Sequence, residues 1–147
     1  VLVLSGRPAE RPASDWLVRA MRPDDLEACD RLCRGVHGIS RRHELEAALR
    51  DLQPLIAERA GHVRAYMTAP NFWIANHGVG KTEADLRALI LGAAEAADSV
   101  SFLLPTRQGG LFRWCLNQGL KAVKPMTLMS LGSYSQPAGA YMPSVFY

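Results

Sequence analysis

The sequence predicts an α/β fold, and three observations support this prediction. Segments with apolar residues at helical spacing alternate with short apolar runs that are typical of strands. A tight turn at residues 60–61 separates two of these runs and predicts an antiparallel hairpin. The 147 residues, of which 48% are hydrophobic and 21% charged, have the size and balance of one globular domain.

The ends of the predicted elements follow from capping residues. Pro and two Asp begin a helix over residues 23–36, because Pro suits a first helical turn and acids suit the positive end of the helix dipole. Thr82 and Asp85 begin a second helix as a capping pair. The other predicted elements are strands at 16–21, 55–59, 62–67, 72–76, 100–104, 120–123 and 126–131, and helices at 40–52 and 108–118.

Residues 75–82, Ala-Asn-His-Gly-Val-Gly-Lys-Thr, form a predicted loop that suits an anion. They match a relaxed P-loop in which Ala75 replaces the first Gly. Gly78 and Gly80 also match a simpler cradle, in which backbone N–H groups at a helix start hold a phosphate. A plain strand-to-helix turn is the structural alternative. ATP hydrolysis is disfavoured, because a P-loop enzyme needs an acid after a second strand and residues 105–106 are Pro and Thr.

Charge and cysteine usage limit the partners and the compartment. A formal net charge of +3 favours small anions, and the chain lacks the basic clusters of a nucleic-acid-binding arm. The three cysteines lack the spacing of a disulfide framework, so a reduced, cytoplasmic protein is expected. Cys29, Cys33 and His37 share one helix face and are expected to be core rather than a metal site. No apolar run is long enough for a membrane span.

The beginning of the chain predicts a domain boundary. A strand-like Val-Leu-Val-Leu-Ser-Gly run precedes residues 7–14, which contain two Arg and two Pro and are typical of a linker. We expect residues 1–14 to comprise the last strand of a preceding domain, at residues 1–6, and a linker. Residues 15–147 would then be the next domain, with a C-terminal tail at 133–147.

Several strings, in order, resemble the GNAT acetyltransferase superfamily. Residues 21–26, Met-Arg-Pro-Asp-Asp-Leu, resemble its strand-to-helix entry, residues 57–66 its hairpin, and residues 118–120 the turn after its last helix. The order of predicted elements is also similar. More narrowly, strings at 72–79, 102–107, 111–116, 125–129 and 143–144 resemble the C-terminal half of bacterial proteins with two GNAT domains in tandem.

The resemblance implies the GNAT (acyl-CoA N-acyltransferase) fold, a mixed, mostly antiparallel sheet with helices on both faces. The strands would part near residues 72–76 and 100–104, where a thioester would lie. It also implies acetyl transfer from acetyl-CoA to an unidentified primary amine, without a metal. The residues that would hold coenzyme A by this resemblance are Asn76, Gly78, Val79, Gly80, Lys81 and Thr82.

The same resemblance implies three candidate catalytic residues. Glu58 or His77 would accept the proton of the amine, and Cys115 occupies the place of a Tyr that in many members protonates the departing thiolate. Structural alternatives are a salt-bridged Glu58 and a His77 that only hydrogen-bonds its surroundings.

Two departures from the family pattern support a non-catalytic alternative. Ala75 stands where the family has Gln or Arg, and Cys115 stands where it has Tyr. The alternative function is a degenerate C-terminal GNAT-like domain that shapes a substrate cleft or an interface. The expected partners are a small amine and, through the tail, a preceding GNAT-like domain or a second copy, with neither nucleic acid nor a membrane.

Overall fold

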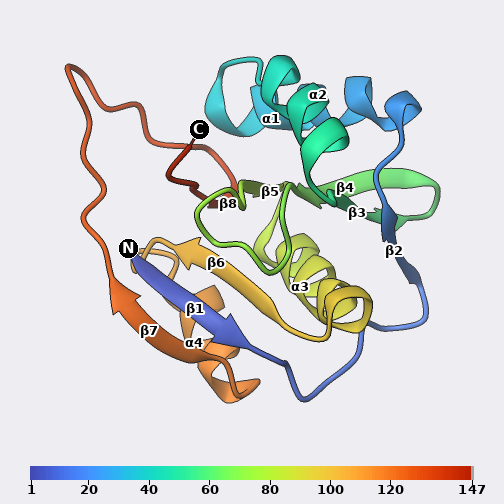
Figure 1. Cartoon of the computed structure of the whole chain (residues 1–147), viewed down its shortest axis with the longest axis vertical. Helices are drawn as coiled ribbons and strands as arrows, with labels where there is room; N and C mark the ends of the chain where they lie inside the picture. Colours follow the sequence, from blue (N-terminus) through green and yellow to red (C-terminus); the bar gives the residue numbers. More distant parts are fainter. Residues whose placement is uncertain (147) are drawn as a thin grey trace.

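The computed structural model describes residues 1–146, in which four α-helices and two β-sheets form an α/β fold (Figure 1). Among these residues, no helix has both the length and the apolar character needed to cross a bilayer. In chain order the elements are β1 (Leu2–Gly6), β2 (Trp16–Ala20), the 3-10 turn η1 (Pro23–Asp25), α1 (Leu26–His37), α2 (Arg42–Asp51), β3 (Leu55–Arg59), β4 (His62–Met67), β5 (Gly78–Gly80), α3 (Glu83–Ala97), β6 (Val100–Leu104), α4 (Gly109–Asn117), β7 (Lys121–Pro125) and β8 (Ala140–Met142).

The larger sheet has the order β2-β3-β4-β5-β8, and each neighbouring pair is antiparallel. Helices α1 and α2 cover one face and α3 covers the other (Figure 1). Alternate residues of a strand point to opposite faces. Ile56 and Tyr66 therefore pack in the cluster with α1, whereas Ala57 and Met67 pack in the cluster with α3. The prediction of helices on both faces is confirmed.

The smaller sheet has the order β6-β1-β7, and β1 is antiparallel to both neighbours. Strands β6 and β7 are therefore parallel to one another, and α4 connects them. Val3 and Leu4 at the centre of β1 are buried. The predicted first strand is thus an internal strand of this fold, and the assignment of residues 1–14 to a preceding domain stays a prediction.

Three predictions for the second half of the chain are wrong. Residues 72–76 form turns instead of a strand, residues 126–131 form neither helix nor strand, and residues 78–80 are a strand instead of a loop. Strand β8 lies in the tail, where three residues are too few to show a period. The other predicted helices and strands are confirmed, with ends that differ by a few residues.

Candidate functional site

Gly78 and Gly80 lie in the buried strand β5, where the missing side chains serve packing. A Cβ atom on Gly78 would overlap the Cε atom of Met142, and a Cβ atom on Gly80 would lie 2.8 Å from Leu86 Cγ. Neither glycine has a positive φ angle. The two glycines therefore admit a neighbouring strand and helix, and they do not form an open loop around an anion. The P-loop alternative loses support as well, because both strands beside β5 run antiparallel to it.

The outer edge of β5 is closed by β8. The register places Gly78 opposite Met142 and Gly80 opposite Ala140. Strand β8 also contacts β6 (Figure 1). Strand β8 therefore joins β5 to β6, whereas residues 72–76 reach β6 directly through the Asn76 side chain.

The side chain of Gln108 fixes the direction of the β8 backbone. Its Nε2 donates to the Tyr141 carbonyl at 2.6 Å, and the Tyr141 N–H donates to Gln108 Oε1 at 3.1 Å. Successive residues of a strand direct their main-chain groups to alternate edges. Ala140 and Met142 thus direct theirs towards β5. Main-chain groups of β5 that could have bound a ligand are occupied by this pairing.

The start of α3 is capped by its own residues, as predicted. The Thr82 N–H donates to Asp85 Oδ2 at 2.7 Å, and the Asp85 N–H donates to Thr82 Oγ1 at 3.3 Å. Asp85 also pairs with Arg64 at 3.2 Å, and the Lys81 N–H donates to the Arg64 carbonyl. These bonds join α3 to β4 and use two of the amides proposed for a phosphate cradle.

A polar cavity of about 400 Å³ lies in front of this helix start. Lys81 and Arg107 line it together with Thr82 and Gln108, and two cations beside a helix N-terminus suit an anion. Glu83 lines the same cavity and opposes a negative ligand. This cavity is where the structure places Lys81 and Thr82, the last two residues of the predicted cradle.

Asn76 is a fully buried link between the turn at residues 72–76 and the smaller sheet. Its Nδ2 donates to the Ser101 carbonyl at 2.9 Å, and its Oδ1 accepts from the Ala69 N–H at 3.4 Å. The side chain is therefore engaged with the backbone on both sides. Its contacts are those of a structural residue.

Glu58 is part of an ion-pair network at the edge of the larger sheet. Arg19 donates to Glu58 Oε1 at 2.7 Å and to the two oxygens of Asp25 at 2.7 and 2.9 Å. Hydrogen bonds from Arg19 hold the pKa of Asp25 below its usual range. The network ties β2 and β3 to the start of α1. The salt-bridged alternative for Glu58 is therefore what the structure contains.

His77 lies immediately before β5 and is 2% exposed. The ring atom Nδ1 of His77 lies 3.3 Å from the Tyr66 hydroxyl, and the backbone N–H of His77 donates to Thr68 Oγ1 at 2.8 Å. Burial, with the nearby charge of Arg41, lowers the pKa of His77 well below its usual value. An imidazole with such a pKa takes up a proton poorly at neutral pH, which weakens its candidacy as a general base.

Cys115 is fully buried in α4, within the cluster that includes α3. Burial raises the pKa of this thiol to about 12. Cys29 and Cys33 are buried in the opposite cluster, as the core interpretation predicted. No hydrogen bond or ring contact among residues 1–146 joins Glu58, His77 and Cys115. The predicted catalytic residues therefore occupy three separate surroundings.

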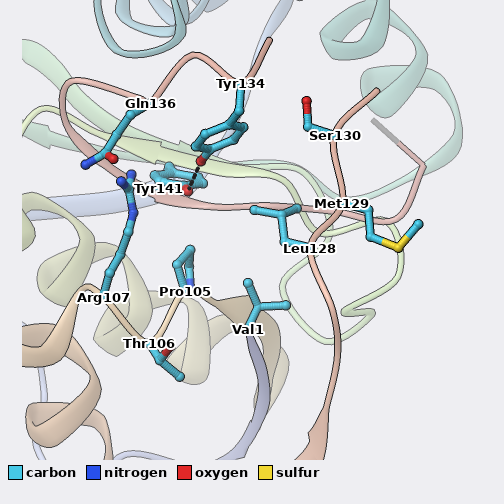
Figure 2. Close-up of a pocket in the computed structure, with 10 residues that line it drawn as sticks. All are labelled: Val1, Pro105, Thr106, Arg107, Leu128, Met129, Ser130, Tyr134, Gln136 and Tyr141. Carbon is cyan, nitrogen blue, oxygen red and sulfur yellow. Dashed lines mark hydrogen bonds between the residues drawn. The ribbon is translucent and has the colours of Figure 1, made fainter. Parts of the chain in front are cut away.

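A cavity of about 410 Å³, which we name the tyrosine cavity, lies beneath residues 126–139, which we name the arm (Figure 2). The hydroxyls of Tyr134 and Tyr141 are 3.1 Å apart along one wall. The Arg107 guanidinium lies 5.3 Å from the centre of the Tyr141 ring. Leu128 and Met129 of the arm line another side. Sequence analysis missed these residues, and the only signal was the concentration of aromatic residues in the tail.

Comparisons with known proteins identify a shared fold. No family model and no curated protein matches the sequence. The structure is similar to the crystal structure of a mutant of TTHA1254 from Thermus thermophilus, with a TM-score of 0.54 and 19% sequence identity. The match covers 82% of this chain and 99% of that chain. At this identity, the likeness supports the α/β fold alone.

Proposed function

We propose that this chain is a GNAT-like domain that serves an N-acetyltransferase without holding acetyl-CoA itself. The order of elements supports the family: a strand, two helices, a hairpin, a short strand, α3, β6, α4 and β7 follow in the order that the resemblance requires. The antiparallel larger sheet with helices on both faces is compatible with the GNAT fold.

The single observation that carries the non-catalytic proposal is the pairing of β8 with β5. By the resemblance, the strand that leads into the helix at Thr82 would hold the pantetheine arm by main-chain hydrogen bonds, and in this structure the strand at that place is β5 (Gly78–Gly80). Here that edge faces Ala140–Met142 of the same chain. The buried Cys115 and the ion-paired Glu58 support the same conclusion, because neither is free to act on a substrate.

The role that remains for such a domain is to line a substrate cleft and a partner interface. The tyrosine cavity offers aromatic and apolar walls for the body of a small organic acceptor. The arm exposes Leu128, Met129 and Leu131, which suits contact with an acetyl-CoA-binding GNAT domain or a second copy.

A second candidate function, acetyl transfer by this domain, is favoured by the polar cavity at the start of α3. Lys81 and Arg107 could hold the pyrophosphate of acetyl-CoA there. For the rest of the coenzyme to bind, β8 would have to leave β5. Glu58 or His77 would then accept the proton of the attacking amine.

Calorimetric titration of the chain with acetyl-CoA separates the two functions. We expect no saturable heat at millimolar acetyl-CoA, because the edge of β5 is occupied. Saturable one-to-one binding that Lys81→Ala weakens would overturn the proposal and support catalysis by this domain. Lys124→Ala removes an equal charge from β7, outside the polar cavity, and serves as the matched control.

A further inference from the structure

A second cavity beneath the arm, of about 290 Å³, lies between the end of α1 and the start of α2. His37 at the end of α1, Arg41 before α2 and His77 before β5 line it. Tyr134 and Tyr141 line it as well and also line the tyrosine cavity. We name it the histidine cavity. Its walls come from parts of the chain that are distant in sequence, so only the fold creates it.

Three buried nitrogens at this cavity lack a hydrogen-bond partner within residues 1–146: His37 Nε2, Arg41 Nε and His77 Nε2. The other such atom in this part of the chain, Arg87 Nε, belongs to a side chain that lies over Trp114. A buried polar group that is left unpaired destabilises the fold, so native structures leave few of them. Arg41 Nε is a donor, and a neutral imidazole donates from Nε2 in the tautomer that leaves Nδ1 unprotonated, so these three atoms suit a ligand that supplies hydrogen-bond acceptors.

The charge of the histidine cavity favours an anion. Arg41 is 17% exposed, and its pair with Glu44 is 4.0 Å long, the outer limit of an ion pair. Among the described residues, no acidic side chain lines the cavity. Burial, followed by the charge of Arg41, lowers the pKa of His37 to about 4 and that of His77 well below its usual value. Both imidazoles are therefore neutral at pH 7, and Arg41 alone supplies the charge.

The remaining walls favour an apolar body. Ile39, Leu128 and Pro137 line the cavity beside the two tyrosine rings. The volume lies near the lower end of the range of small-molecule sites, which begins at about 300 Å³. A guanidinium binds a carboxylate through two parallel hydrogen bonds, so one arginine and a small apolar space suit a compact monocarboxylate.

We propose that the histidine cavity binds a small organic carboxylate with an aromatic or branched apolar body, held by Arg41 and by the imidazoles of His37 and His77. The three nitrogens are buried in this structure, so binding requires the surrounding side chains and the arm to move. Tyr134 is 52% exposed and bonds to the Tyr141 hydroxyl, and the Ala138 N–H also holds the arm to the Val36 carbonyl at 2.7 Å. This site uses none of the main-chain groups at the edge of β5, although it shares His77 with the second candidate function.

Phenylacetate is a suitable probe, and the four histidines of the chain provide the readout. His43, with a side chain that is 99% exposed, and the exposed His62 lie outside the cavity. We expect phenylacetate at pH 7 to shift the imidazole NMR signals of His37 and His77 saturably and to leave those of His43 and His62 in place. Equal shifts of all four signals, or no saturable shift at about 10 mM, would overturn the proposal.

Matched variants and ligands test the role of the charge. Arg41→Gln should weaken phenylacetate binding at least about tenfold, the loss expected for one charged hydrogen bond. Arg42→Gln, which removes the neighbouring exposed arginine, should change it less than about twofold. Phenylacetamide, which has the same body without the charge, should bind the wild-type chain at least about tenfold more weakly, and this comparison holds even if Arg41→Gln fails to fold. Equal affinity for the two ligands would contradict the proposal.

Discussion

At the scale of single residues, the structure separates groups that hold the fold from groups that are available to a ligand. Arg19 joins Asp25 and Glu58 through charged hydrogen bonds, and all three side chains are at most 20% exposed. Cys115 is enclosed by the core. Arg107 and Arg41, in contrast, line cavities. Of the residues that sequence reasoning placed in catalysis, Glu58 and Cys115 are therefore structural and His77 lines the histidine cavity, whereas Arg41 and Arg107 were not singled out.

Replacing Arg19 with Met should lower the free energy of unfolding by about 2–3 kcal/mol at pH 7, because two neighbouring carboxylates lose their counter-charge. Urea denaturation measures the change. Arg11→Met is the control, since the Arg11 pair with Glu95 is exposed and should contribute less than about 0.5 kcal/mol. A loss below about 1 kcal/mol for Arg19→Met would show that the network is not stabilising.

The same variant has an expected pH dependence. The pKa of Asp25 is lower in the fold than in the unfolded chain, so its contribution is present above about pH 4 and is lost as pH falls through the folded value. The stability difference between wild type and Arg19→Met should therefore shrink in strong acid. A difference that stays constant down to about pH 2 would contradict this assignment.

At the scale of elements, β5 and β8 define the candidate site by fitting together. The absence of a side chain at Gly78 leaves room for Met142, which is fully buried. Gln108 fastens the far edge of β8. A motif that was interpreted as a phosphate cradle is thus explained by strand packing.

A double-mutant cycle tests this packing. Gly78→Ala and Met142→Ala should each lower the free energy of unfolding. The loss in the double variant should be smaller than the sum of the two single losses by at least about 1 kcal/mol, because the smaller side chain at position 142 makes room for the new methyl group. Gly80→Ala combined with Met142→Ala is the control, since a Cβ on Gly80 meets Leu86 instead. That pair should be additive within about 0.5 kcal/mol. If the losses of Gly78→Ala and Met142→Ala are additive, the Met142 side chain of β8 does not pack against Gly78 of β5.

The helices could be predicted from sequence because their signals are local. The Thr82 and Asp85 cap and the apolar stripe of α3 lie within one segment. Strand β8 could not be predicted, because its partners are β5 and the side chain of Gln108, far away in the chain. The role of Glu58 was equally hidden, since its sequence neighbourhood does not reveal Arg19 on the adjacent strand.

At the scale of the whole molecule, segments from both ends of the chain complete the fold. Strand β1 lies between β6 and β7, and β8 extends the larger sheet (Figure 1). The arm between β7 and β8 covers both the tyrosine cavity and the histidine cavity. Strand β8 thus closes the outer edge of β5, and these two cavities lie under the arm.

Hydrogen exchange at the amides of Gly78 and Gly80 shows whether β8 closes the edge of β5. We expect slow exchange at both amides in the free protein, as for paired strands, and no change at millimolar acetyl-CoA. Fast exchange in the free protein, or protection that appears only when acetyl-CoA is added, would contradict this expectation and would mean that this edge is open to the coenzyme.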